Sequence, residues 1–289
     1  EKPDAILVQG DTTTAQVAGL CAFYRRIPLG HVEAGLRSHD LDAPFPEEMN
    51  RRVISMVGAW HFAPTGLAKQ NLLDEKVPAS SIFVTGNTVI DALLEMRERI
   101  RKTPPALPAA IEAVLAAKRP VVLITGHRRE SFGQGFENIC EALKRLAERH
   151  KDVSFVYPVH LNPQVDAIVR ARLGAVANIV LEAPLSYKPF VRLMDASRIL
   201  LTDSGGLQEE GPSLGKPVLI MRKTTERPEG VTAGVNKVVG TDVEAIVSSV
   251  DALLTDAKGY AQMASTKNPY GDGTAGKQIA EILRKALAP

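Results

Sequence analysis

Short apolar runs alternate along the chain with longer segments in which apolar residues recur every three or four positions. The runs predict buried β-strands and the longer segments predict amphipathic helices, because side chains repeat every two residues in a strand and every 3.6 in a helix. Strands are expected at 5–9, 29–33, 60–63, 81–85, 121–124, 155–157, 179–181, 199–202 and 218–220, and helices at 13–26, 46–57, 66–75, 88–101, 136–149, 163–173, 244–254 and 275–287. This alternation favours parallel sheets with right-handed crossovers.

A proline-rich segment divides the pattern in two. Residues 103–108 read Thr-Pro-Pro-Ala-Leu-Pro, which predicts a linker. We expect an α/β fold of two Rossmann-like, doubly wound domains facing a cleft. The first domain spans 1–102, the second, nucleotide-binding domain spans 103–272, and a C-terminal helix at 273–289 packs back toward the first domain. The chain opens almost directly in a strand without a phosphate loop, so the first domain is expected to be N-terminally incomplete.

Composition narrows the class of protein. Hydrophobic residues make up 45% and charged residues 24% of the chain, which is ordinary for a globular protein. The net charge of +2 gives no basic field of the kind that binds nucleic acid, and no apolar run is long enough for a membrane span. Cys21 and Cys140 have neither metal-ligand spacing nor the pattern of a disulfide framework, which favours a reducing cytoplasm. No metal or other cofactor is expected.

The most informative segment is the run from Thr202 to Ser213, which follows the predicted strand at 199–202. Ser204, Gly205 and Gly206 lie where the strand turns into a helix, so that backbone N–H groups and the helix N-terminus are available to a phosphate. Glu210 lies one turn further along, where a carboxylate suits ribose hydroxyls. The run indicates a nucleoside diphosphate site, although an ordinary strand–turn–helix corner has the same pattern.

Other polar residues follow predicted strands. Each has an ordinary alternative: Asp11 as a helix cap, Glu33 as a salt-bridged surface group, His127 as part of a surface cluster with Arg128, and His160 as a loop residue. Because parallel strands end at the same edge of a sheet, and ligands bind there in open α/β folds, their common position favours a functional interpretation.

Seven ordered motifs together resemble a known family. They are Gly-Asp-Thr-Thr-Thr at 10–14, His-Val-Glu-Ala-Gly-Leu-Arg at 31–37, Pro-Glu-Glu-Met-Asn-Arg at 46–51, Thr-Gly-Asn-Thr-Val-Ile-Asp at 85–91, Gly-His-Arg-Arg-Glu-Ser at 126–131, Asp-Ser-Gly-Gly-Leu-Gln-Glu-Glu at 203–210 and Thr-Thr-Glu-Arg-Pro-Glu at 224–229. The chain resembles the bacterial non-hydrolysing UDP-N-acetylglucosamine 2-epimerases over nearly its whole length. That family's N-terminal strand and Gly-Thr-Arg-Pro-Glu loop have no counterpart here.

The resemblance implies a two-domain GT-B fold, a homodimer, and reversible conversion of UDP-N-acetylglucosamine to UDP-N-acetylmannosamine. It assigns catalysis to Asp11, Glu33, Glu47 and His127, and substrate binding to Ser204, Gly205, Gly206, Glu210 and Arg227. Arg128 and His160 match positions associated with a second, activating UDP-N-acetylglucosamine.

The chemistry of such an epimerisation favours elimination, because the C2 proton is not acidic and the sequence has no nicotinamide-binding fingerprint. Cleavage of C1–O releases UDP, a carboxylate takes the C2 proton, and UDP then re-adds to 2-acetamidoglucal. Three other functions remain open at this point: a glycosyltransferase of the same fold, a hydrolysing epimerase, and a non-catalytic UDP-sugar sensor. The three carboxylates Asp11, Glu33 and Glu47 argue against a sensor.

Overall fold

The computed structural model describes residues 3–42, 44–128 and 132–288. The chain forms two compact units. The first comprises residues 1–92 and 269–289, and the second comprises residues 93–268. The division falls inside helix α4 (Thr88–Lys102), whereas the sequence placed it after this helix, at the proline-rich segment that separates α4 from α5 (Ala109–Ala116).

The first unit is built on a four-stranded parallel sheet with the order β1-β2-β3-β4. Its elements are β1 (Ile6–Gln9), α1 (Thr13–Tyr24), β2 (Leu29–Val32), α2 (Glu47–Val57), β3 (Trp60–Ala63), α3 (Gly66–Asp74), a 3-10 turn at Ala79–Ser81, β4 (Ile82–Val84), the start of α4, and α13 (Ala275–Ala286).

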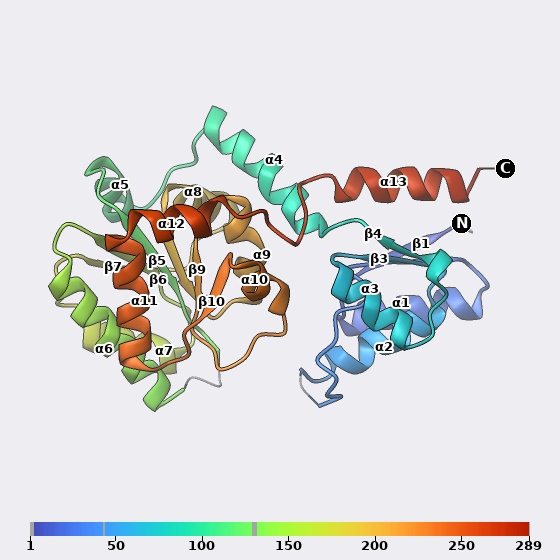
Figure 1. Ribbon diagram of the computed structural model, residues 1–289, viewed down its shortest axis with the longest axis horizontal. Helices are drawn as coiled ribbons and strands as arrows, with labels where there is room; N and C mark the ends of the chain where they lie inside the picture. The colour runs from blue at the N-terminus through green and yellow to red at the C-terminus, as the bar shows by residue number, and fades with distance from the viewer. Residues whose placement is uncertain (1–2, 43, 129–131, 289) are drawn as a thin grey trace. The chain divides into compact units, whose positions relative to one another are not determined.

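Helices cover both faces of this sheet (Figure 1). On one face, Val8 and Leu29 pack against α1 and α2, and α3 covers Ala63 and Ile82. On the other face, Ile279 of α13 packs against Val32 and Phe62. The backbone N–H groups at the start of α13 donate to the carboxylate of Asp91, so an acid late in the first segment caps a helix almost two hundred residues further along the chain.

The second unit is built on a six-stranded parallel sheet with the order β10-β9-β8-β5-β6-β7. Its remaining elements are β5 (Val121–Thr125), α6 (Gln134–Arg149), β6 (Ser154–Pro158), α7 (Pro163–Leu173), β7 (Ile179–Glu182), α8 (Tyr187–Ala196), β8 (Ile199–Thr202), α9 (Gly205–Ser213), β9 (Val218–Ile220), α10 (Pro228–Ala233), β10 (Asn236–Val238), α11 (Val243–Thr255) and α12 (Ala257–Ser265).

Alternating side chains of the central strands explain the two cores of this unit. Val122 and Ile124 of β5 face the core under α6, α7 and α11, and Leu123 faces the core under α5 and α8. A strand buried on both faces reads as a continuous apolar run, which is why the sequence marked these strands clearly. The predicted α/β class with parallel sheets is confirmed.

The chain reverses the order of its strands between β5 and β8. From β5 it builds outward through β6 and β7, and it then returns to place β8 on the opposite side of β5. At such a switch point the connections leave the two strands in opposite directions, which opens a crevice at their carboxyl ends. The fold alone therefore nominates the ends of β5 and β8 as a ligand site.

Sequence periodicity located most elements to within one or two residues and missed α5, α8, α10, α12 and β10. The missed elements are short or are flanked by prolines, such as Pro108 before α5 and Pro228 at the start of α10. Short elements contain too few turns for a periodic signal to emerge.

Candidate functional site

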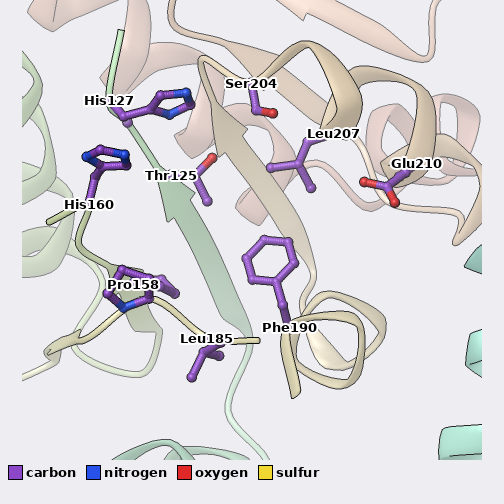
Figure 2. A pocket seen from close by; sticks show the side chains of 11 residues that line it. Thr125, His127, Pro158, His160, Leu185, Phe190, Ser204, Leu207 and Glu210 are labelled. Carbon is purple, nitrogen blue, oxygen red and sulfur yellow. The ribbon is translucent and has the colours of Figure 1, made fainter. Parts of the chain in front are cut away.

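A cavity of about 270 Å³ lies at the switch point of the second unit (Figure 2). Its lining combines an apolar wall with a few polar groups: Thr125, Gly126, His127, Pro158, His160, Pro184, Leu185, Phe190, Ser204, Leu207 and Glu210. The ends of β5 and β8 are joined beside it, since the hydroxyl oxygens of Thr125 and Thr202 lie 2.5 Å apart. Concave sites of this mixed lining are typical of small-molecule binding.

Ser204 stands at the start of α9, where its backbone is extended and its own N–H donates to Thr202 Oγ1 at 2.9 Å. Gly205 and Gly206 then begin the helix, so their N–H groups belong to its unpaired first turn. A methyl group on Gly205 would come within 2.7 Å of Arg227 Nη1, which explains why the chain has a glycine there. A helix start of this kind is suited to an anion, which is the role that the sequence analysis predicts for these three residues.

His127 follows β5 and is anchored by Asp203, a residue only 1% exposed. Asp203 Oδ2 accepts hydrogen bonds from the backbone N–H groups of His127 and Arg128, at 2.7 and 2.8 Å. His127 Nδ1 lies 3.1 Å from the other oxygen, Oδ1. Burial raises the pKa of Asp203, but the hydrogen bonds from His127 and Arg128 outweigh it and hold the pKa below its usual range. Asp203 is therefore a carboxylate, and the sequence analysis did not select it.

The two neighbouring acids of α9 have different surroundings. Glu209 is buried and accepts from Arg227 Nε, whereas Glu210 lines the cavity. Burial, together with the charge of Glu209, raises the pKa of Glu210 to about 7. Glu210, which the sequence predicts to bind the ligand, therefore presents its carboxyl group at the cavity wall.

Arg227 does not line the cavity but lies directly behind the turn at Ser204 and Gly205. Its Nη1 donates to Glu226 at 2.6 Å, and its Nε donates to Glu209. Glu226 in turn accepts from Arg222 at 2.7 Å. The guanidinium is fixed against Gly205 by two carboxylates, which places a positive charge beside the first turn of α9.

His160 lies in the same cavity as His127, and the two rings stack with centroids 5.3 Å apart. Figure 2 shows them together on one side of the cavity, with Ser204 and Glu210 on the other. Of the predicted motif at 126–131, Arg128 is described through its contact with Asp203, and Arg129, Glu130 and Ser131 lie outside the described residues.

The three predicted catalytic acids all lie in the first unit, on separate segments. Asp11 follows β1 and pairs with Arg51 Nη1 at 2.9 Å, and Asn50 donates to its carbonyl at 2.8 Å. Glu33 follows β2, adjacent to β1, and its Oε2 would lie 3.5 Å from a methyl group on Gly10. The two acids therefore stand at the same edge of the sheet.

Glu33 has a positive φ of 68°, a conformation that costs a non-glycine residue free energy and that is concentrated at functional sites. Asn87 Nδ2 donates to Glu33 Oε1 at 3.4 Å. Glu47 begins α2, and its Oε2 is buried without a hydrogen-bond partner among the described residues. These two features favour the functional interpretation of Glu33 and Glu47 over the alternative of ordinary surface acids.

Glu48, next to Glu47, is the acid that the fold itself uses. It is fully buried and accepts hydrogen bonds from the backbone of Ser38 and His39 and from the side chains of Arg51 and Arg52. Burial raises its pKa, but these donors, Ser38 and Arg51 foremost, outweigh it and lower the pKa to about 2. Arg51 thus bridges Glu48 to Asp11, a link that motif matching did not reveal.

Two buried histidines lie side by side in this sheet, His31 on β2 and His61 on β3. His31 Nε2 lies 2.8 Å from the carbonyl oxygen of Gly10, the residue before Asp11. Burial lowers the pKa of each ring to about 4. His31 therefore supports the Gly10–Asp11 turn as a neutral ring.

No cluster of His, Cys, Asp or Glu in the described part of the chain is arranged to hold a metal ion. The helices in these same residues include none that is long and apolar enough to cross a membrane. The second unit is a doubly wound α/β unit with the N-terminus of a helix at its switch point, an arrangement typical of nucleotide-binding proteins.

Comparisons with known proteins identify the family. A family profile described as UDP-N-acetylglucosamine 2-epimerase matches residues 1–284. The UDP-N-acetylglucosamine 2-epimerase of Yersinia pestis is 55% identical over 285 residues, which cover 98% of this chain and 76% of that protein. The chain therefore belongs to the UDP-N-acetylglucosamine 2-epimerase family, as the seven motifs predicted.

Solved structures agree with this assignment. The chain is similar to the Neisseria meningitidis UDP-GlcNAc 2-epimerase bound to UDP-GlcNAc, with a TM-score of 0.88 and 48% identity over 98% of this chain and 77% of that one. It is also similar to the Methanocaldococcus jannaschii enzyme in complex with UDP-GlcNAc and UDP, with a TM-score of 0.80 and 34% identity over 99% and 76% of the two chains.

Proposed function

We propose that this chain catalyses the reversible epimerisation of UDP-N-acetylglucosamine at C2 to give UDP-N-acetylmannosamine. The observation that carries the proposal is the cavity at the switch point, which joins Ser204 at a helix N-terminus, the anchored His127 and the carboxyl of Glu210. A nucleoside diphosphate presents groups that match these, namely two phosphates for the helix N-terminus and a ribose for the carboxyl of Glu210. Family membership and the UDP-sugar complexes of related structures support the same ligand.

Each part of the cavity suits one part of the nucleotide. Phe190, Leu185 and Pro158 form the apolar wall, which favours a flat base. Glu210 as a carboxylate accepts from ribose hydroxyls. The N–H groups of Gly205 and Gly206, together with the Ser204 hydroxyl and the charge of Arg227 behind them, bind the diphosphate.

The chemical step is an elimination followed by re-addition. The C1–O bond breaks with its electron pair going to the UDP oxygen, the C2–H electron pair forms the C1=C2 double bond, and a carboxylate takes the proton. Re-addition of UDP and return of a proton to the opposite face of C2 give the epimer. Asp11, Glu33 and Glu47 supply the proton-transfer groups, and His127 stabilises the leaving diphosphate. The electron pairs and the proton are all accounted for in these steps, so the reaction needs no external cofactor.

Two further features belong to the proposal. The active form is a homodimer, and a second UDP-N-acetylglucosamine activates it through Arg128 and His160. The stacking of His160 on His127 favours this coupling, because a ligand that moves one ring disturbs the other. Hyperbolic kinetics in the reverse direction without added UDP-N-acetylglucosamine would contradict the activation.

The deciding experiment is proton NMR of the chain with UDP-N-acetylglucosamine in D₂O. Formation of UDP-N-acetylmannosamine, with deuterium at C2 of both sugars, is the expected result. Free N-acetylmannosamine with UDP would instead indicate a hydrolysing epimerase. No conversion, with UDP bound in a titration, would favour a glycosyltransferase, which needs an acceptor, or a UDP-sugar sensor.

A further inference from the structure

Gln208 is fully buried in α9 and links two segments that the proposed nucleotide site uses. Its Nε2 donates to the carbonyl oxygen of Ser204 at 3.2 Å, and its Oε1 accepts from the Thr225 hydroxyl at 2.5 Å. Thr225 Oγ1 accepts in turn from the backbone N–H of Arg227 at 3.1 Å. A continuous chain of hydrogen bonds therefore runs from the turn at Ser204 to the segment that carries Arg227.

We propose that Gln208 is a positioning residue that holds the turn at Ser204 and the Arg227 segment at a fixed spacing, so that a diphosphate meets both at once. The diphosphate is the ligand of the proposed function, and this part of the inference rests on that function. The hydrogen-bonded link between the two segments does not depend on any ligand.

The direction of each hydrogen bond follows from the groups involved. The carbonyl oxygen of Ser204 can only accept, so the NH₂ group of Gln208 must face it and the amide oxygen must face Thr225. The Thr225 hydroxyl then gives its single hydrogen to that amide oxygen, and its own oxygen accepts from the Arg227 N–H. Gln208 cannot rotate out of this chain without leaving buried polar groups unpaired, which costs free energy.

The spacing matters because Arg227 packs directly on the turn. A methyl group on Gly205 would lie 2.7 Å from Arg227 Nη1 and 3.1 Å from its Cζ, so the guanidinium leaves no room for a side chain there. The ion pairs of the guanidinium hold the far end of this side chain, whereas Thr225 holds its backbone and Gln208 ties that backbone to the turn. Because the attraction between a guanidinium and a phosphate falls with distance, a shift of this segment should weaken anion binding.

The helix turn that carries Gln208 has a support that is independent of its side chain. Pro212 has no N–H and cannot donate to the carbonyl oxygen of Gln208, as the residue four positions along a helix normally does. The side chain of Asn236 donates to this oxygen instead, at 3.0 Å. Substitution of the Gln208 side chain should therefore leave α9 in place and break only the link to Ser204 and Thr225.

Two substitutions break the link from opposite ends. Gln208→Met keeps an unbranched side chain of similar length, but it cannot donate to Ser204 and accepts only weakly from Thr225. Thr225→Val keeps the shape of threonine and removes the hydroxyl, whereas Thr225→Ser retains the hydroxyl. The matched control is Thr255→Val, which removes an exposed hydroxyl that donates to a backbone carbonyl of α11 outside the cavity lining.

The first measurement is the affinity of each chain for UDP and for uridine by calorimetry. Gln208→Met and Thr225→Val should each weaken UDP binding by roughly tenfold to a hundredfold, the range for a hydrogen bond to a charged group. Uridine has no phosphate and should bind all the chains alike, and Thr225→Ser and Thr255→Val should bind UDP as the wild type does. Equal losses of UDP and uridine affinity in Gln208→Met would overturn the positioning role, because they would show damage to the whole cavity.

The second measurement is hydrogen exchange of the Arg227 backbone amide in the chain without ligand. Exchange should be faster than in the wild type in Thr225→Val, which removes the acceptor, and in Gln208→Met, which releases Thr225. Thr225→Ser should keep the wild-type rate. An unchanged rate in Gln208→Met would show that Gln208 does not hold this segment, and the inference would be wrong.

The two measurements separate this inference from the proposed function. If the wild-type chain does not bind UDP, the proposed ligand is wrong, and exchange of the Arg227 amide still decides whether Gln208 links the two segments. If this exchange rises in Gln208→Met while UDP affinity is unchanged, the link exists but the positioning role is refuted. If Gln208→Met does not fold, the comparison of Thr225→Val with Thr225→Ser tests the same link from its other end.

Discussion

Glu48 in the first unit and Glu210 in the second are both glutamates on a helix, α2 and α9 respectively, and their surroundings are opposite. Glu48 accepts from two backbone N–H groups and two arginines, and its pKa is lowered to about 2. Glu210 has Glu209 as its charged neighbour, and burial and that charge raise its pKa to about 7. The first carboxylate has all its partners within the fold, and the second faces a cavity.

The difference separates acids that build the structure from acids that are available to a ligand. A satisfied buried ion gains nothing from a ligand, whereas a desolvated acid without donors is stabilised by hydroxyl groups that a ligand brings. Asp11 is intermediate, since it pairs with Arg51 while its side chain stays 30% exposed. Perturbed acids in cavities are therefore better candidates for function than acids in closed ion-pair networks.

The largest effect is expected at the intermediate class of acid. Asp11→Asn and Glu33→Gln should each lower kcat by roughly 10²–10⁴-fold while UDP binding is retained, because under the proposed function each substitution removes a proton-transfer group that lies outside the unit containing the cavity. Turnover by NMR and UDP affinity by calorimetry measure the two parts separately.

The control for this pair is Asp74→Asn, an exposed acid at the end of α3 whose partner is Gln70. It should keep the wild-type rate. A near-wild-type kcat in Asp11→Asn or in Glu33→Gln would remove that residue from the mechanism.

The structural class of acid should instead affect stability. Glu48→Gln leaves Arg51 and Arg52 facing a neutral amide, and Arg51 is almost fully buried. Breaking a buried ion pair from one side costs about 3–5 kcal/mol of unfolding free energy. Urea denaturation at neutral pH measures it, with Glu98→Gln as the control, because Glu98 pairs with Arg97 and Arg101 on an exposed surface. Equal effects of the two substitutions would contradict the structural role of Glu48.

The pair Glu47-Glu48 also shows what the sequence can and cannot predict. The pattern Pro-Glu-Glu predicted a helix start correctly, because acids favour the first turn. It carried no information on which glutamate turns inward, since that depends on Arg51, Arg52 and the distant backbone of Ser38. Resemblance selected Glu47, and only the three-dimensional contacts identified Glu48.

Fold prediction succeeded where the physical signal is local and repeated. The strand at 199–202 and the helix at 163–173 were predicted with their observed bounds, because buried strands and long helices repeat one pattern several times. Asp203 was inside the most informative run and was still not selected. Its role depends on His127, some seventy-six residues earlier in the chain, and no spacing rule links the two.

The two buried histidines predict a pH dependence of stability. In the folded chain the pKa of His31 and of His61 is about 4, below the unfolded value of about 6.5, so the unfolded chain binds protons first as the pH falls. The stabilising contribution is complete above pH 6.5 and is lost between about pH 6.5 and pH 4, by up to about 3 kcal/mol for each ring. Glu48 adds a separate loss from about pH 4.5 down to about pH 2.

Urea denaturation across this range tests the histidines. Between about pH 6 and pH 4.5, His61→Gln should reduce the slope of unfolding free energy against pH. The reduction should be close to the slope produced by the uptake of one proton on unfolding. A slope that is the same in wild type and variant would show that His61 does not take up its proton on unfolding.

The smallest predicted effect concerns Glu210, the acid that lines the cavity, and it is the sharpest test of the comparison with Glu48. In the proposed function, ribose hydroxyls donate to the ionised form of Glu210, so a protonated Glu210 must lose its proton before the ligand binds. With a pKa of about 7 in the free chain, affinity for UDP-N-acetylglucosamine should rise about tenfold between about pH 6 and about pH 8.

The Asp11→Asn chain is the protein to titrate, because it should bind without turnover. Adding Glu210→Gln should weaken binding at the higher pH by about tenfold, the value of a hydrogen bond to a charged group, and abolish the pH dependence. The matched addition of Glu229→Gln, an acid on α10 outside the cavity lining, should leave both the affinity and its pH dependence in place. A pH dependence that persists without Glu210 would mean that another group titrates on binding, and the contrast between a satisfied and an available carboxylate would then not explain ligand recognition here.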